Sequence, residues 1–206
     1  MLDPVTEVRA AAAPAGSPHA LPDLLLIERA RAQDTRAIEM LTRRYAQRLY
    51  RLARSVLGDE LAAEGVVQES CVAAFDELRR REAAGKFAAW LTRLALEHAR
   101  ARRDAAPAAG RAGAAGRHPL EVQVDALPEV FRTVFVLRAL DGMSGPETAL
   151  LLGLHETTVR TRLYRAHRRL SVTPGAAGTT AVFELDAART ERIVAGVLGR
   201  LRTGSA

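Results

Sequence analysis

One stretch, from Ser144 to Leu170, limits the fold of this chain more than any other. Glu147 follows Ser144 by three residues, a spacing typical of the capping box that begins a helix. Gly153 suits a tight turn between two helices, because glycine adopts a positive φ without steric cost. Apolar residues then recur every three or four positions, as on one face of a second helix; they are Val159, Leu163, Ala166 and Leu170. The pattern predicts a helix-turn-helix.

The second helix of this motif is strongly basic on its other side. Residues 157–170 contain five arginines and no acidic residue. An ordinary solvated basic face usually carries Glu or Asp at i±4, so we favour contact with DNA over that alternative. We expect this helix to enter the major groove of duplex DNA. Its candidate contact residues are Thr157, Thr158, Arg160, Thr161, Arg162, Arg165 and Arg168.

The overall charge agrees with an anionic partner. Lys and Arg number 30 against 24 Asp and Glu, which gives a formal net charge of +6, and such a balance favours nucleic acid. Lys86 is the only lysine, and so strong an arginine bias, beside so much alanine, is also typical of a GC-rich genome. The charge therefore supports DNA binding only together with the helix-turn-helix pattern.

Other functional classes find little support. Cys71 is the only cysteine, which excludes an internal disulfide and a cysteine-rich zinc site. We find no phosphate-cradling glycine loop, no nucleophile motif and no paired carboxylates with a plausible base beside them, so we expect no enzyme, no catalytic residue, no cofactor and no metal ligand. No apolar run has membrane-spanning length, and residues 1–20 do not form a secretory signal. A cytoplasmic protein without a membrane segment is expected.

The periodicity of the whole chain predicts an all-α fold. Apolar residues recur at helical spacing in every patterned stretch, and none alternates as a strand would. Helices are expected at about residues 23–32, 34–58, 59–78, 87–103, 128–142 and 186–200. Two small helical domains, an N-terminal helical bundle and a C-terminal helix-turn-helix, are then joined by a flexible linker and followed by a short C-terminal helix. We expect this last helix to dock onto a domain rather than to bind a separate partner.

The expected domain boundaries follow from composition. Alanine, glycine and proline dominate where periodicity is lost, which is typical of disordered or flexible segments. The expected divisions are a disordered tail at 1–21, a first domain at 22–103, a linker at 104–120, a second domain at 121–171, and a linker with the C-terminal helix at 172–206.

Short motifs in both halves point to one family. The first half contains Tyr45-x-x-x-Leu49-Tyr50-Arg51-Leu52-Ala53, Leu57-Gly58-Asp59, Val67-Gln68-Glu69 and Phe87-x-x-Trp90-Leu91; the second contains Leu127-Pro128-Glu129, Gly142-Met143-Ser144, Leu152-Gly153-Leu154 and Thr158-Val159-Arg160-Thr161-Arg162-Leu163. In this order, the motifs resemble bacterial RNA polymerase sigma factors of the extracytoplasmic-function (ECF) type. The resemblance covers about residues 23–103 and 121–171.

The resemblance implies a transcription initiation factor that binds core RNA polymerase and directs it to promoters. The second half would read the −35 element as duplex, and the first would bind polymerase and read the −10 element. Core RNA polymerase and promoter DNA are the implied partners, and an anti-sigma factor is a further candidate. The implied polymerase-binding residues are Glu64, Gln68 and Glu69; the candidates for −10 contact are Arg93, Glu97, Arg100, Arg102 and Arg103. Trp90 suits a stacking platform, but its apolar neighbours favour a core position.

Three positions depart from the family's pattern. Gly65 stands where an acidic residue is usual, Glu97 where an asparagine helps to hold an extruded −10 base, and His155 where a serine caps the recognition helix. A carboxylate only accepts hydrogen bonds and repels phosphate, so Glu97 predicts a different −10 sequence or weaker promoter melting. These departures keep an alternative open, a sigma-like helix-turn-helix regulator that binds DNA without directing promoter melting.

Overall fold

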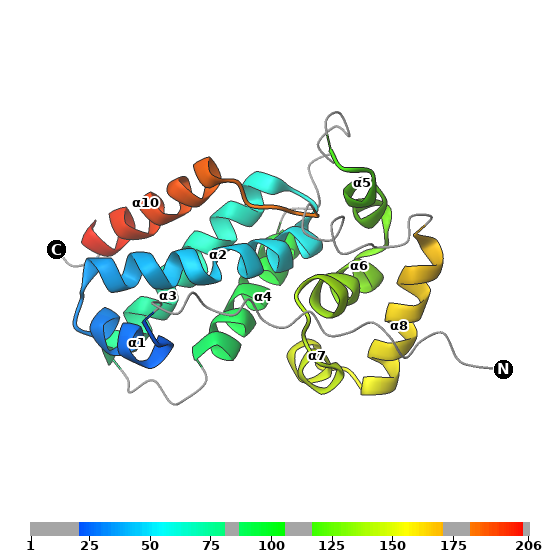
Figure 1. Cartoon of the computed structure of the whole chain (residues 1–206), viewed down its shortest axis with the longest axis horizontal. Helices are drawn as coiled ribbons and strands as arrows, with labels where there is room; N and C mark the ends of the chain where they lie inside the picture. The colour runs from blue at the N-terminus through cyan, green and yellow to red at the C-terminus, as the bar shows by residue number, and fades with distance from the viewer. Residues whose placement is uncertain (1–20, 81–86, 106–116, 171–181, 204–206) are drawn as a thin grey trace.

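The computed structural model describes residues 21–80, 87–105, 117–170 and 182–203 (Figure 1). Every regular element within these ranges is helical, which confirms the all-α prediction. The expected N-terminal tail, most of the expected 104–120 linker and the start of the 172–206 segment lie outside the described residues. Within the described parts, no helix combines the length and the apolar character needed to cross a membrane.

The first four helices form an N-terminal bundle. They are α1 (Asp23–Arg31), α2 (Thr35–Leu57), α3 (Glu60–Arg80) and α4 (Phe87–Ala105). The polar residues expected at the helix starts do cap them: Asp34 accepts hydrogen bonds from the first-turn amides of α2, and Asp59 accepts one at 2.7 Å from the Ala62 amide of α3. Gly58 ends α2 with φ 72°, a left-handed conformation that favours glycine.

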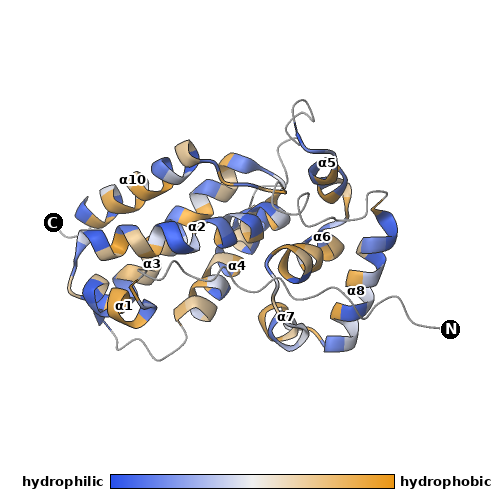
Figure 2. Ribbon diagram, viewed as in Figure 1, coloured by the Kyte–Doolittle hydropathy of each residue, from blue (hydrophilic) through white to orange (hydrophobic). Residues whose placement is uncertain are grey.

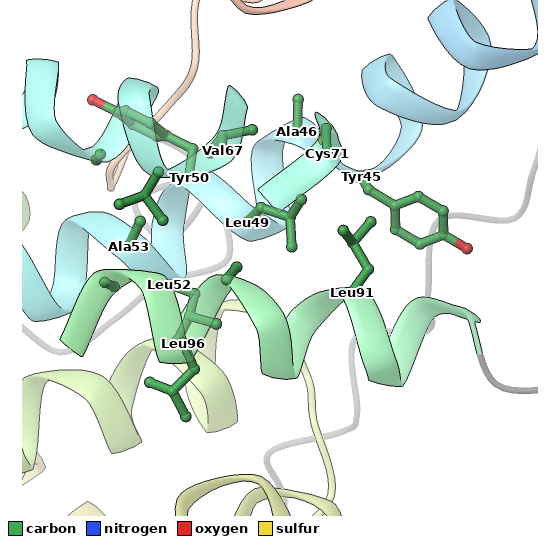
Figure 3. Packing of buried hydrophobic residues seen from close by; sticks show 14 of the residues in the cluster. Tyr45, Ala46, Leu49, Tyr50, Leu52, Ala53, Val67, Cys71, Leu91 and Leu96 are labelled. Carbon is green, nitrogen blue, oxygen red and sulfur yellow. The ribbon is translucent and has the colours of Figure 1, made fainter. Parts of the chain in front are cut away.

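Leucine contacts between α2 and α4 form the centre of this bundle. Figure 3 shows Leu49 and Leu52 of α2 beside Leu91 and Leu96 of α4, and each of these side chains is at most 2% exposed. Cys71 of α3 is fully buried in the same cluster. Burial of this apolar surface is what holds the helices together.

A helix-turn-helix unit follows. It contains α5 (Pro119–Ala126), α6 (Glu129–Phe135), a π-helical turn labelled η1 (Val136–Leu140), α7 (Gly145–Leu152) and α8 (Glu156–Arg169). The periodicity did not predict α5, whose first residues fall within the expected linker. His118 caps it by accepting a hydrogen bond from the Leu120 amide at 3.2 Å. Leu120 and Val124 become fully buried, so tertiary packing stabilises a helix too short to show a clear period.

The last described helix, α10 (Ala187–Thr203), packs against α2 and α3 (Figure 1). Asp186 caps it by accepting a hydrogen bond from the Arg189 amide at 2.7 Å. The predicted docking of this helix onto a domain is therefore confirmed. The chain returns from the helix-turn-helix unit to the N-terminal bundle, so residues far apart in sequence lie side by side there.

Candidate DNA and polymerase interfaces

The helix-turn-helix has the local geometry that its sequence predicted. Ser144 and Glu147 form a reciprocal capping box at the start of α7, and the two hydrogen bonds from Ser144 lower the pKa of Glu147. Gly153 ends α7 with φ 68°. Val159 of α8 is 1% exposed and packs with Val134 and Ala149 in a small separate core. This core fixes the angle at which α8 is presented.

The predicted outward face of α8 is exposed. Thr157, Arg160, Thr161, Arg165 and Arg168 are exposed, while Thr158 and Arg162 are half-buried. The helix is largely hydrophilic in Figure 2. Its inward stripe is also as predicted, because Ala166 is fully buried and Leu163 and Leu170 are partly buried.

The structure adds aromatic residues to this face. A hollow of about 600 Å³ is lined by Phe131, Thr161, Tyr164, Arg165, Arg168 and Arg169. Tyr164 is 58% exposed, and the Arg169 guanidinium lies 4.9 Å from the centre of the Phe131 ring. Tyr164 lies on the same helix as the predicted contact residues but was not among them, whereas Phe131 belongs to α6.

The start of α8 shows the structural effect of His155, one of the three departures from the family's pattern. His155 occupies the N-cap position, with extended backbone, but its side chain makes no capping hydrogen bond. Histidine is not among the favoured N-cap residues. The first amides of α8 therefore lack the side-chain cap that a serine supplies.

The −10 candidates on α4 divide into two groups. Arg93 and Glu97 are exposed and pair with each other, with Arg93 Nε 3.2 Å from Glu97 Oε1. Arg102 instead donates to Glu69 and Arg103 to Glu129, Arg103 Nη1 lying 2.6 Å from Glu129 Oε1. Arg100 is half-buried. The structure therefore does not bring the five residues together on one free basic face.

Gly65 has a structural consequence that involves Arg102. The Arg102 side chain crosses α3 at Gly65, so a Cβ at this position would lie 2.5 Å from Arg102 Nη1. The same Nη1 donates to the Ala62 carbonyl at 3.1 Å. In this chain, the Arg102 guanidinium therefore occupies the space beside Gly65 where the family usually has an acidic side chain.

Trp90 lies in a partly buried position at the edge of the bundle core. Its ring meets Phe87 edge to face, with ring centres 5.9 Å apart. This packing agrees with the core position that the sequence favoured, because edge-to-face contacts are a preferred aromatic geometry.

The three polymerase-binding candidates lie on α3, but each of them contacts another part of the chain. Glu64 is only 5% exposed and forms ion pairs with arginines of α10. Gln68 donates to the Arg192 carbonyl of α10 at 3.2 Å. Glu69 is engaged by Arg102, as described above. The sequence did not predict that other parts of the chain occupy these residues.

Comparison with known proteins gives the family. The Sigma-70 region 2 family model matches residues 41–105, and the Sigma-70, region 4 model matches residues 117–170. These two segments make up more than half of the 206 residues. The chain belongs to the Sigma-70 family of sigma factors, and the relatives described next place it among those of the ECF type. The resemblance inferred from the sequence motifs is thereby confirmed, as is promoter-directed transcription initiation in place of the regulator alternative.

Individual relatives agree with this assignment. The sigma factor is 30% identical over 151 residues to the ECF RNA polymerase sigma factor SigE of Mycolicibacterium smegmatis, covering 63% of this chain and 58% of that protein. It is 27% identical to the RNA polymerase sigma-H factor of Pseudomonas aeruginosa, covering 72% of this chain and 91% of the relative. The solved structure of CnrH in complex with the cytosolic domain of CnrY has 32% identity and a TM-score of 0.53, covering 72% of this chain and 94% of CnrH.

The two units of this sigma factor pack directly against each other. The apolar cluster of the bundle continues through Leu120 and Val124 of α5 into Phe135 and Leu137. The sequence predicted two units joined by a flexible linker. The structure instead shows a closed arrangement in which the units share a buried surface.

Polar contacts also cross this junction. Arg132 of α6 is 5% exposed and donates from Nε to the Ser55 carbonyl of α2 at 2.6 Å. Arg51 of α2 lies 3.5 Å from Asp141, which follows η1. Burial raises the pKa of Asp141 to about 6, against the opposing effect of Arg51. The junction is thus partly apolar and partly ionic.

Proposed function

We propose that this sigma factor binds core RNA polymerase through α3 and places α8 on the −35 element and α4 on the −10 element. The observation that carries this assignment is the exposed outward face of α8 on a helix-turn-helix, which carries no acidic residue after Glu156 in its first turn. It is supported by the region 2 and region 4 matches, which fall on the two units in the expected order.

The proposed −35 contact uses direct readout and phosphate contact together. Arg160, Arg165 and Arg168 are exposed on α8, and arginine suits both guanine edges and phosphates. Thr157 and Thr161 lie on the same side, although the Thr161 hydroxyl donates back to the Thr157 carbonyl at 2.8 Å. Tyr164, exposed beside them, adds a surface for apolar contact within the groove.

The proposed −10 contact starts from the exposed Arg93 and Glu97 and the half-buried Arg100 of α4. Opened DNA needs cations for its phosphates and a surface for unstacked bases. Arg102 and Arg103 join this surface once Glu69 and Glu129 release them. The Glu97 carboxylate at this place supports a −10 preference that differs from the usual one of the family.

Separation of the two units is part of the proposal. The −35 and −10 elements lie apart on a promoter, so α8 and α4 must leave the closed arrangement to reach both. We propose that polymerase binding supplies the opposing contacts and sets the distance between the two units. A cytoplasmic location is also part of the proposal. We further propose regulation by an anti-sigma protein, because CnrH, which is 32% identical to this chain, was solved in complex with the cytosolic domain of a second protein, CnrY.

Run-off transcription tests this function. Core RNA polymerase is combined with the full chain and a library of promoter fragments, and the 5′ ends of the transcripts are mapped by sequencing. We expect new start sites that share two motifs at fixed spacing. Transcription no higher than that of core polymerase alone, both for the wild-type chain and for the variants Arg192→Glu and Gly196→Gln, would contradict the proposed function.

A further inference from the structure

Helix α10 lies along the bundle face that carries the proposed polymerase-binding residues. Figure 1 shows it in red and orange beside α2 and α3, at the opposite end of the chain from them in sequence. Its apolar side is buried against them: Ile193, Val194, Val197 and Leu201 are each at most 7% exposed. Such a seam removes apolar surface from water on both sides of the contact.

Ion pairs flank the apolar seam on both sides. On the α3 side, Arg192 Nη2 lies 2.9 Å from Glu64 Oε1, and Arg192 Nε lies 3.2 Å from Glu64 Oε2. On the α2 side, Arg43 Nη1 lies 2.7 Å from Glu191 Oε1. The charges of α10 therefore complement both helices beneath it, which fixes its orientation.

Arg189 extends this complementarity along α3. It donates to Glu60 and, at 2.6 Å, to the hydroxyl of Tyr50, and its Nε lies 3.7 Å from Glu64. Glu64 thus meets two arginines of α10 while it is almost completely removed from solvent. A partner that needs the Glu64 carboxylate must first displace α10.

Gln68 is held by backbone contact with the same helix. A Cβ placed on Gly196 would lie 2.6 Å from Gln68 Cδ. The glycine therefore allows the Gln68 amide to lie flat against α10, where it donates to the Arg192 carbonyl. By contrast, a Cβ on Gly199 would meet no atom within 4 Å.

The segment before α10 is fastened to the junction between the two units. The Gln47 side chain of α2 donates to the Phe183 carbonyl and accepts from the Leu185 amide, both at 2.9 Å. The Phe183 ring is 2% exposed and lies 4.9 Å from the Arg54 guanidinium. Docking of the C-terminal segment and closure of the two units therefore share residues.

We propose that residues 182–203 are an intramolecular inhibitor that competes with core RNA polymerase for the Glu64 and Gln68 face of α3. The inference rests on the proposed role of that face. Because the helix is tethered to its site, it competes at high effective concentration without a second protein. The apparent affinity for polymerase is then reduced by the fraction of molecules in which α10 is docked.

A charge reversal on α10 tests the competition directly. Arg192→Glu replaces an attractive contact with Glu64 by a repulsive one and leaves α3 unaltered. Arg200→Glu is the matched control, because Arg200 is exposed in the last turn of the same helix. Binding of the full chain to core polymerase is measured by surface plasmon resonance. We expect Arg192→Glu to lower the apparent Kd by about three- to tenfold, and Arg200→Glu to match the wild type.

A second pair of variants tests the same contact through size rather than charge. Gly196→Gln forces a side chain into Gln68, whereas Gly199→Gln makes the same change where nothing is close. We expect tighter polymerase binding and higher run-off transcription for Gly196→Gln alone. Circular dichroism and thermal unfolding show whether each variant remains folded.

The outcomes separate the inference from the proposed function on which it rests. If Arg192→Glu and Gly196→Gln, both folded, bind polymerase no more tightly than their controls, α10 does not compete and the inference is overturned. Gln68→Ala in the Arg192→Glu background then tests the face itself. Weaker polymerase binding supports α3 as the contact whatever α10 does, whereas unchanged binding contradicts both the proposed face and the inhibitor.

Discussion

Arg54 and Asp125 form a buried, two-point ion pair between the N-terminal bundle and the helix-turn-helix unit. Arg54 Nη2 lies 2.6 Å from Asp125 Oδ2, and Nη1 lies 2.9 Å from Oδ1. The Arg54 side chain is 1% exposed. Arg117 also reaches Asp125, at 2.7 Å. One carboxylate therefore pairs with two guanidinium groups at the surface that must open if the two DNA contacts form as proposed.

Asp125→Ala is expected to destabilise the closed chain. Removing one partner of a buried pair leaves an uncompensated charge and typically costs about 3–5 kcal/mol. Urea unfolding followed by circular dichroism measures the free energy of unfolding. Asp76→Ala is the control, because its pair with Arg79 is at the surface and contributes roughly 0–1 kcal/mol.

The double variant Arg54→Met with Asp125→Leu extends this test. Apolar replacement of a buried ion pair is often neutral for stability, so we expect the double variant to lose less stability than Asp125→Ala. An equal or greater loss would show that the pair contributes more than it costs to desolvate.

Arg165→Ala is expected to weaken binding to duplex DNA and to reduce its dependence on salt. Each phosphate contact contributes a slope of about 0.9 in log K against log salt concentration, so loss of one contact lowers the slope by about that amount. Fluorescence anisotropy over a salt series gives both quantities. Arg36→Ala, an exposed arginine on α2, should leave them unchanged; an unchanged slope for Arg165→Ala would place the DNA contact elsewhere.

Glu97→Asn is expected to raise the yield of open complexes. The substitution removes a negative charge next to the proposed path of the DNA and releases Arg93, which now pairs with Glu97. Interactions between exposed charges amount to roughly 0.2–1 kcal/mol, or about a 1.4- to fivefold change. Permanganate footprinting on promoters with varied −10 sequences measures the yield, with Glu28→Gln as an exposed acid-to-amide control. Equal yields on every −10 variant would count against a role for Glu97 in reading bases.

Asp141→Asn is expected to change how stability depends on pH. Burial raises the pKa of Asp141 from 3.8 to about 6, so the folded state holds a proton that the unfolded state has released between these values. Its contribution to stability is therefore present below about pH 4 and is lost as pH rises to 6. A pKa difference of this size corresponds to about 3 kcal/mol.

The stability difference between Asp141→Asn and the wild type isolates this group, because carboxylates with lowered pKa, such as Glu147, affect both proteins equally. We expect the difference to shift in favour of the variant from pH 4 to pH 7, as measured by urea unfolding at each pH. A constant difference across that range would mean that Asp141 does not titrate in this way.

Local signals in the sequence predicted most of the fold. Caps at Asp34, Ser144 and Asp186, and turn glycines such as Gly58, act over one helical turn, so the spacing of a few residues reveals them. The apolar stripe of α8 was predicted correctly for the same reason. Helix α5 was not predicted, because its two buried apolar residues, Leu120 and Val124, acquire their partners only when the units pack together.

Apart from α5, the sequence by itself determined the described helices, the helix-turn-helix and the family, because each depends on residues within a few turns of one another. Tertiary structure alone decided which charges meet: Arg54 and Asp125 are separated by 71 residues, and Glu64 and Arg192 by 128. No periodicity encodes such pairings, since they depend on how whole helices pack. Burial by distant segments is what turned Glu64 and Gln68 from expected surface residues into contacts of α10.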